Sequence, residues 1–405
     1  MRLLWSSNAP WSTSGYGVQS RHLLPRFKGL GHDVAIFAWD GLHHGRLTID
    51  NIDIYPGGYL PFGFDLVGEH VKHFKADLVV SVQDIWPLPE DYKQKVGTRW
   101  ASWFPIDGEP APRSVIKIAK TCDYCLCYSQ HGTEQVEAAG VKCRYIPLGV
   151  ETRTFYPADK RAARETLGMS PDGFLCAMVA ANRGYPSRKA FSANVQAFAR
   201  LYHEHPELDA RLYLHTEQSR VENGIDLDQL VRALGIHDRV LFPDPYQNMI
   251  GLPETAMAHI YNAADVLLAA SMGEGFGIPI IEAQACGTPV ITTDFTSMSE
   301  LTFNGVCTKP GQKFFTALDH WWVEPSIDNI YSALCTIVGW DDHTRKGMAE
   351  WGTKVMRRDY EWDVVVTRHW VPFFEEVEQQ MAPAFLTPER QDGADAGVAQ
   401  SAKGE

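Results

Sequence analysis

Short apolar runs alternate with amphipathic stretches along the first part of the chain. Continuous apolar runs indicate strands buried on both faces of a parallel sheet, whereas a period near 3.6 indicates helices. The expected strands are Arg2–Ser6, Asp33–Ala38, Asp77–Val82, Arg99–Phe104, Tyr124–Tyr128 and Cys143–Ile146. The expected helices are Val18–Leu30, Ser114–Lys120 and His131–Ala139. Alternation of this kind predicts a doubly wound parallel sheet.

A second α/β series begins after a break in the pattern at residues 147–157. Its expected strands are Phe174–Ala180, Ala210–His215, Val240–Phe242, Val266–Leu268 and Pro289–Thr293. Its expected helices are Lys189–His203, Leu227–Leu234, Thr255–Asn262, one beginning near Pro279, Ile327–Val338 and Thr344–Arg358. We therefore predict domains at 1–150 and 151–360. A terminal amphipathic helix follows at 361–380, and residues 381–405, rich in polar residues, glycine and alanine, are expected to be disordered.

Bulk properties narrow the classes of protein that fit. The chain has 405 residues, 45% of them hydrophobic, which suffices for two cores, and its net charge is −13. That charge disfavours a protein that coats nucleic acid or adheres strongly to anionic membranes. The sequence contains neither an apolar run long enough to span a bilayer nor the pattern of a signal peptide, so we expect a cytoplasmic protein. The eight cysteines are scattered, and Cys125 and Cys127 alternate on an apolar strand, which favours buried thiols over a metal site.

The segment Ser271–Ile291 carries the strongest chemical signal. Glu274 lies in a glycine-rich loop after an expected strand, and Glu282 follows eight residues later in the helix that Pro279 can begin. A strand, glycine loop and helix N-terminus in this order present backbone N–H groups to an anionic or hydroxyl-rich ligand. The plainer alternative is an ordinary βαβ unit whose glycines only form turns.

This segment resembles the Glu-x7-Glu signature of retaining glycosyltransferases of the GT-B fold, above all glycosyltransferase family 4, also called group 1. The Gly-Phe-Gly-x-Pro within it and the Glu-Ala-x-Ala-x-Gly-x-Pro-Val after it make the match specific. The resemblance implies two Rossmann-like domains facing across a cleft, with a catalytic role for Glu274 at the donor sugar and contact of Glu282 with the nucleotide ribose. Matching donor-binding loop positions are Gly275, Phe276, Gly277 and Ile278.

A basic loop follows the first expected strand of the second domain. Cleavage of a nucleotide sugar leaves a diphosphate, whose growing negative charge requires cations nearby. Arg183 and Lys189 match the pair that grips this diphosphate in the resembled family, and Arg188 is placed to assist. Because these cations supply the charge, and Asp341-Asp342 lies outside the core motif, we expect transfer without a metal and without a cofactor. A solvated basic loop is the alternative interpretation.

Two first-domain loops complete the candidate site. Gly15 and Gly17 follow the first strand and match a loop that contacts the donor phosphate in the resembled family. A third glycine is missing, which weakens an NAD-binding interpretation. The family often places a histidine where this chain has Ile106, so we expect Asp107, or failing that Asp84, to act there. Either carboxylate could instead cap a helix or close a turn.

Other polar and aromatic residues near strand ends have weaker assignments. His131 is expected to begin a helix, and His215 belongs either to the core or to the base pocket. Tyr246 precedes the segment that contacts the base in the resembled family. Some tryptophans could stack on sugar rings, namely Trp11, Trp86, Trp100 and Trp103. Tryptophans in this number are more often core residues.

Taken with the resemblance, these residues predict a metal-independent hexosyltransferase acting in glycan biosynthesis. Its partners would be a UDP- or GDP-sugar donor and a hydroxyl acceptor that the sequence does not identify, a glycan, lipid-linked glycan or protein among them, with at most peripheral membrane contact. Two alternatives stay open: a non-catalytic nucleotide-sugar or glycan-binding module, and a nucleotide-sugar epimerase of the same fold.

Overall fold

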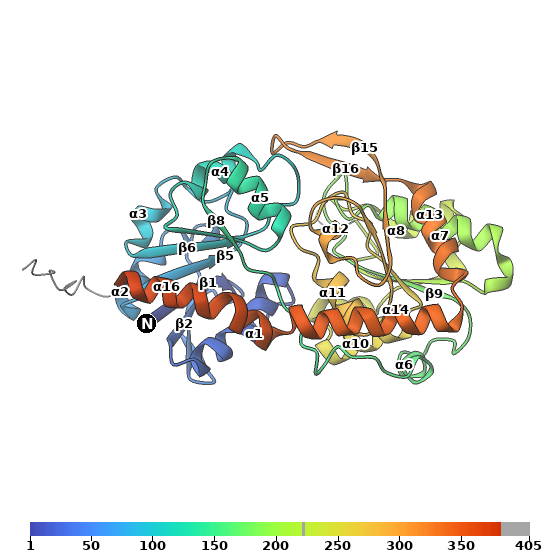
Figure 1. The fold of residues 1–405 in the computed structure, drawn as a ribbon, viewed down its shortest axis with the longest axis horizontal. Helices are drawn as coiled ribbons and strands as arrows, with labels where there is room; N and C mark the ends of the chain where they lie inside the picture. Colours follow the sequence, from blue (N-terminus) through green and yellow to red (C-terminus); the bar gives the residue numbers. More distant parts are fainter. Residues whose placement is uncertain (221–222, 382–405) are drawn as a thin grey trace, which may run out of the picture.

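The computed structural model describes residues 1–220 and 223–381, which form two α/β domains and a terminal helical segment (Figure 1). The predicted tail from residue 382 onward lies outside the described residues, whereas Met381 ends the last helix. Apart from the edge strand β3, the strands of both large sheets run parallel, as predicted.

The first domain is built on an eight-stranded sheet in the order β3-β4-β2-β1-β5-β6-β7-β8. The strands are β1 Arg2–Asn8, β2 Asp33–Asp40, β3 Leu47–Ile49, β4 Ile52–Pro56, β5 Leu78–Val82, β6 Arg99–Phe104, β7 Tyr124–Cys127 and β8 Cys143–Tyr145. The helices are α1 Gly15–Gly29, α2 Val67–Phe74, α3 Tyr92–Val96, α4 Arg113–Ala119 and α5 Gln130–Ala138. The pattern did not predict β3, β4, α2 and α3. Strand β3 is an exposed antiparallel edge and so lacks the apolar run of a buried strand.

The second domain has a six-stranded parallel sheet in the order β11-β10-β9-β12-β13-β14. The strands are β9 Leu175–Val179, β10 Arg211–His215, β11 Val240–Leu241, β12 Val266–Leu268, β13 Val290–Thr293 and β14 Val306–Thr308. The helices are α6 Lys160–Thr166, α7 Phe191–Glu204, α8 Leu227–Ala233, α9 Pro245–Ile250, α10 Glu254–Ala263, α11 Ile278–Ala285, α12 Ser297–Leu301, α13 Ile327–Val338 and α14 Asp342–Val355. Helix α7 begins at Phe191, two residues later than predicted, which leaves Lys189 in the preceding loop.

A two-stranded antiparallel hairpin, β15 Pro310–Phe315 and β16 Trp321–Pro325, leaves the second domain and reaches the first (Figure 1). The sequence analysis did not predict it. Backbone hydrogen bonds join Glu109 and Trp321 in both directions, at 3.2 and 2.8 Å, and Lys313 lies 3.1 Å from the Glu109 carboxylate. The hairpin therefore bridges the two domains on one side of the cleft between them.

The chain crosses between the domains twice, and the two crossings lie side by side. The amide of Val150 donates to the carbonyl of Tyr360 at 2.8 Å. After the π-helical segment Met356–Tyr360, the chain continues through α15 Trp362–Val365, a π-helical segment Val366–Trp370 and α16 Val371–Met381. Fully buried Trp370 packs against the rings of Trp5 and Trp103, so this terminal segment belongs to the core of the first domain.

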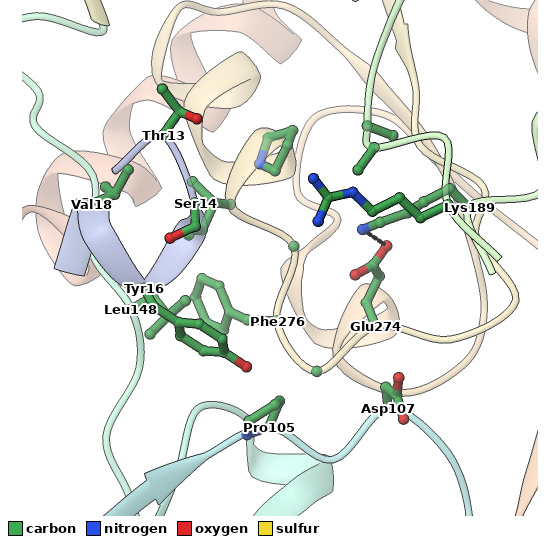
Figure 2. Close-up of a pocket in the computed structure, with 18 of the residues that line it drawn as sticks. Thr13, Ser14, Tyr16, Val18, Pro105, Asp107, Leu148, Lys189, Glu274 and Phe276 are labelled. Atoms are coloured by element: carbon green, nitrogen blue, oxygen red, sulfur yellow. Dashed lines mark hydrogen bonds and ion pairs between the residues drawn. The ribbon is translucent and has the colours of Figure 1, made fainter. Parts of the chain in front are cut away.

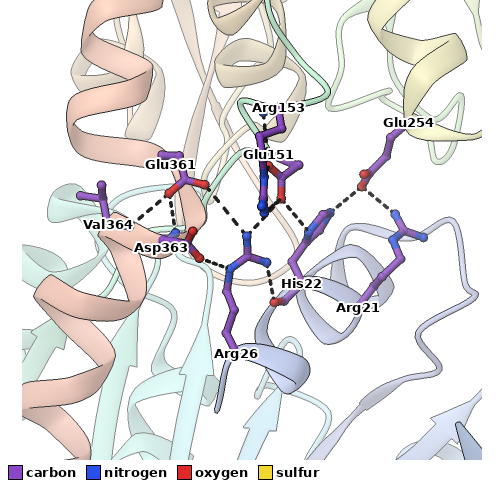
Figure 3. A network of polar contacts seen from close by, with 9 residues as sticks. All are labelled: Arg21, His22, Arg26, Glu151, Arg153, Glu254, Glu361, Asp363 and Val364. Atoms are coloured by element: carbon purple, nitrogen blue, oxygen red, sulfur yellow. Dashed lines mark hydrogen bonds and ion pairs between the residues drawn. The ribbon is translucent and has the colours of Figure 1, made fainter. Parts of the chain in front are cut away.

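A polar network surrounds the crossing (Figure 3). Buried Glu151, at the start of the second domain, accepts from Arg26 of α1 at 3.0 Å and from Arg153 at 2.8 Å. Burial alone would raise the pKa of Glu151, but the two guanidinium groups lower it to about 2. On the same helix, His22 lies 2.7 Å from Glu254 of α10. Charged pairs thus tie α1 to both the crossing and the second domain.

Candidate functional site

The site lies where the strand order of each sheet reverses. In open α/β sheets ligands bind outside the carboxyl ends of the strands at such a reversal. In the second sheet it falls between β9 and β12, which lead into the basic loop and the Glu274 loop. In the first sheet it falls between β1 and β5, which lead into the Gly15 loop and to Asp84. These four loops enclose a cavity of about 890 Å³ between the domains.

The structure brings together nearly all the predicted site residues. The predicted residues that line the cavity are Gly15, Asp107, Arg183, Arg188, Lys189, Glu274, Gly275, Phe276, Gly277, Ile278 and Glu282. Asp84 also lines it. Gly17 is not among the lining residues of the described chain. It lies in the first turn of α1, where any side chain would collide with the carbonyl oxygen of Ser12.

Glu274 is the buried centre of the second-domain wall, with 5% of its surface exposed. Its Oε1 accepts from Lys189 Nζ at 2.5 Å (Figure 2). The same oxygen accepts from Ser271 Oγ at 2.7 Å, and Oε2 accepts from Arg188 Nη1 at 2.9 Å. Burial alone would raise the pKa of Glu274, but Arg188 and Lys189 outweigh it and lower the pKa to about 2. The side chain is therefore an ionised carboxylate at neutral pH, held in a fixed orientation.

Hydroxyl groups from the next loop fix the backbone around Glu274. The amide of Glu274 donates to Thr296 Oγ1 at 2.9 Å, and Ser297 Oγ lies 2.8 and 2.7 Å from the carbonyl oxygens of Glu274 and Phe276. Thr296 is held at φ 54°, an uncommon conformation for a β-branched residue. At Gly275, a Cβ would lie 2.2 Å from Pro105, so only glycine permits this approach of the two domains.

Helix α11 points its first turn into the cavity and carries Glu282. It follows Gly277, at φ 107°, and among the described residues no side chain caps its N-terminus. Glu282 accepts from the hydroxyl of Tyr261 at 2.6 Å. Burial raises the pKa of Glu282 to about 7, and Glu254 adds to this, while Tyr261 opposes it. The pKa values of the two motif glutamates thus shift in opposite directions. Glu274 is ionised at neutral pH, whereas Glu282 titrates near neutrality.

The basic loop supplies the cations of the site. Lys189 and Arg188 both contact Glu274, and Arg188 Nε also lies 3.4 Å from Asp107 across the domain boundary. Burial lowers the pKa of Lys189, with Arg188 adding to the effect and Glu274 opposing it. Arg183 lies in an exposed part of the same loop and lines the cavity. Arg188 and Lys189 therefore lie beside Glu274, which is in the loop that leads into α11.

The first-domain wall is acidic. Asp84 accepts from the hydroxyl of Tyr16 at 3.0 Å, a contact that sequence reasoning did not anticipate. Burial raises the pKa of Asp84, and nearby Asp107 raises it further. Ile106 is 2% exposed, belongs to the first-domain core and lines the cavity with its apolar side chain.

The remaining candidates separate into cavity and core. His215 ends β10, lines the cavity and lies 3.2 Å from the hydroxyl of Tyr213. His131 lies in the first turn of α5, and its Nε2 is 3.2 Å from the carbonyl oxygen of Gly108. Tyr246 is exposed on α9, and Asn248 of the same helix lines the cavity together with Gly251 and Leu252. Of the four tryptophans singled out, Trp100 and Trp103 are fully buried, whereas Trp11 and Trp86 are exposed.

The cysteines and the acidic residues form no metal centre in the described chain. Across residues 1–220 and 223–381, no group of three or more potential ligands comes together. Burial raises the pKa of Cys122 and Cys127, as expected for thiols in a core.

A membrane-spanning helix is not found among residues 1–220 and 223–381, because none of their helices combines the length and apolar character that a bilayer crossing requires.

Comparison with known proteins identifies the second domain. Residues 176–322 match the family model described as glycosyl transferases group 1. This segment is a group 1 glycosyltransferase domain. D-inositol 3-phosphate glycosyltransferase 2 of Catenulispora acidiphila is 35% identical over 209 residues, covering 49% of this chain and 47% of that protein. The enzyme of the same kind from Stackebrandtia nassauensis is 36% identical over 168 residues, covering 40% and 36%. The matches span less than half the length of these curated relatives.

Solved structures confirm the predicted GT-B fold of the described chain. Sucrose-phosphate synthase from Thermosynechococcus elongatus superposes with a TM-score of 0.75 at 17% identity, covering 93% of this chain and 99% of that one. Anabaena HepE, in complex with UDP and glucose, gives a TM-score of 0.69 at 16% identity, covering 93% and 100%. At this identity the likeness establishes the arrangement of the two domains.

Proposed function

We propose that the protein transfers a hexosyl group from a nucleoside-diphosphate sugar to a hydroxyl acceptor, with retention of configuration and without a metal. The observation that supports this proposal is Glu274, a buried carboxylate held by Lys189 and Arg188 in the loop just before α11. Its carboxylate oxygens can accept hydrogen bonds from sugar hydroxyls, and they lie beside the positive charges that a diphosphate leaving group needs.

In the proposed reaction the bond between the anomeric carbon and the diphosphate oxygen breaks, and its electron pair stays with the diphosphate. The acceptor oxygen forms the new bond on the same face of the sugar, and its proton passes to a phosphate oxygen. Lys189, Arg183 and the N-terminal turn of α11 stabilise the leaving charge. Glu274, with its pKa lowered to about 2 and both oxygens occupied, orients sugar hydroxyls and forms no covalent intermediate.

The charges of the first-domain wall favour an acceptor without phosphate. Of the described first-domain residues that line the cavity, the charged ones are Arg21, Asp40, Asp84 and Asp107. Arg21 is engaged by Glu254 at 2.8 Å, so a phosphorylated acceptor would face three carboxylates without an available cation on this wall. The curated relatives, by contrast, are named D-inositol 3-phosphate glycosyltransferases.

The test is a donor panel followed by an acceptor panel, both in EDTA. UDP-glucose comes first, because the HepE structure holds UDP and glucose, followed by UDP-N-acetylglucosamine and GDP-mannose. We expect a thermal shift and slow nucleotide release with one of them, and faster release with uncharged polyols than with their phosphates. Binding without release, with or without acceptors, would favour the binding module. Conversion of donor to its epimer would favour the epimerase.

Donor affinity is expected to depend on pH through Glu282. Its pKa is raised to about 7, so the carboxylate that would accept the ribose hydroxyls forms as pH rises through that value. Binding favours the ionised form, so affinity for UDP-glucose should increase up to about tenfold between pH 6 and 8. The phosphates of a nucleotide sugar do not titrate in this range. Isothermal titration calorimetry should show the rise in the wild type and a flat profile in Glu282→Gln; a wild-type profile as flat as that of the variant would contradict the assignment.

A further inference from the structure

The β15–β16 hairpin carries a buried histidine into the cavity. His320 precedes β16 and is 0% exposed, yet it lines the same cavity as Glu274 and Asp107. The hairpin is held on both sides of it. Trp321 exchanges backbone hydrogen bonds with Glu109 of the first domain, and the amide of Val323 donates to the carbonyl of Met272 at 3.0 Å. The imidazole is thus placed by contacts to both domains.

His320 has unsatisfied hydrogen-bonding capacity. Neither its Nδ1 nor its Nε2 has a hydrogen-bond partner among the described residues. Burying a polar group in this way costs free energy, so packing alone does not explain the choice of histidine. His131 and His215 differ from it, because His131 contacts the carbonyl oxygen of Gly108 and His215 contacts the hydroxyl of Tyr213.

The surroundings favour a neutral ring and a close fit. Burial lowers the pKa of His320, and Arg188 adds to this, while Asp107 opposes it. A Cβ at position 108 would lie 2.7 Å from His320 Nδ1, so Gly108 leaves room for the ring. Ile106 offers no polar group on this wall. A neutral imidazole has one donor and one acceptor nitrogen, which matches a hydroxyl, itself both donor and acceptor, better than a phosphate.

We infer that His320 binds a hydroxyl of the transferred sugar and helps to select the donor. This inference rests on the proposed function and names a further residue of the same site. His320 would approach the sugar from the side of Asp107. Glu282 and His215 lie elsewhere along the cavity wall, on α11 and at the end of β10.

The test compares UDP with UDP-glucose in His320→Phe, which keeps a ring but removes both nitrogens, and in His320→Gln, which keeps an amide donor and acceptor. We expect His320→Phe to lower kcat/KM for UDP-glucose about 10- to 100-fold while UDP affinity stays within about twofold. His320→Gln should recover much of that loss. The control is His131→Phe, since this neighbouring ring does not line the cavity and should leave the ratio of UDP-glucose to UDP affinity unchanged.

UDP-glucose analogues that lack one hydroxyl identify the contact. The analogue that lacks the hydroxyl bound by His320 should be equally poor with the wild type and with His320→Phe. Equal weakening of UDP and UDP-glucose in His320→Phe, or unchanged kcat/KM, would overturn this inference while leaving the proposed function in place. A wild type that turns over neither UDP-glucose nor the other donors of the panel would overturn both.

Discussion

Replacing Glu274 by glutamine is expected to reduce kcat by roughly 10²–10³. Glutamine has nearly the same shape but cannot carry the charge that holds Lys189 and Arg188, at 2.5 and 2.9 Å, in their present positions. Both the sugar and the leaving group then lose their fixed partners. Steady-state turnover of the best donor, measured beside UDP affinity, checks this. Unchanged turnover in Glu274→Gln would contradict the central place of this carboxylate.

The same substitution is expected to lower stability in a pH-dependent way. The pKa of Glu274 falls from 4.5 to about 2 on folding, so its ionised form stabilises the folded state. The shift corresponds to about 3 kcal/mol, present in full above pH 4.5 and lost as pH falls towards 2. The difference in melting temperature between the wild type and Glu274→Gln should therefore be constant above pH 5 and shrink below 4.5.

A matched control separates this effect from general surface charge. Glu137 is exposed on α5, away from the cavity, and Glu137→Gln removes the same charge. Its melting temperature should follow that of the wild type across the whole range. A Glu274→Gln difference that persists unchanged at pH 3 would show that the stabilisation does not come from ionisation.

The parallel core of both domains could be predicted because strands buried on both faces have a recognisable local sequence pattern. Strands such as Leu175–Val179 and Val266–Leu268 are continuous apolar runs, a pattern set by burial on both faces. The short exposed strand Leu47–Ile49 lacks that pattern, because its pairing with β4 depends on the backbone. The hairpin was missed for a related reason, since contacts with Glu109 and Met272 hold it in place.

The site was predictable where its residues are contiguous and not where they converge from distant segments. Glu274, Glu282 and Lys189 lie in two loops with recognisable spacing. Tyr261, which holds Glu282, and His320 lie on elements with no such motif, and only the fold brings them into contact with the site. A signal for His320 existed in the apolar residues on either side of the turn at Asp319, which favour a hairpin. That both ring nitrogens of His320 lack a hydrogen-bond partner among the described residues depends on packing and could not be predicted from the sequence.

Replacing Lys189 by methionine is the second change with a large expected effect. Methionine keeps most of the length of the side chain but removes the ammonium group, so a charge-assisted contact to the diphosphate worth about 1.5–3 kcal/mol is lost. The affinity for UDP should fall about 10- to 100-fold. Turnover should fall further, by roughly 10²–10³, because the contact strengthens as the leaving group gains charge. Lys142→Met, on an exposed residue of the first domain, is the control.

A double-mutant cycle distinguishes the two contacts proposed for Lys189. If Lys189 acted only by holding Glu274, adding Lys189→Met to Glu274→Gln would lower UDP affinity and turnover no further. If it also binds the diphosphate, the double variant should lose UDP affinity as strongly as Lys189→Met alone, while the losses in turnover combine less than additively because the two side chains are in contact. UDP affinity is the decisive measurement, since UDP lacks the sugar that Glu274 would bind. A double variant that binds UDP as well as Glu274→Gln does would assign Lys189 to the support of Glu274 alone.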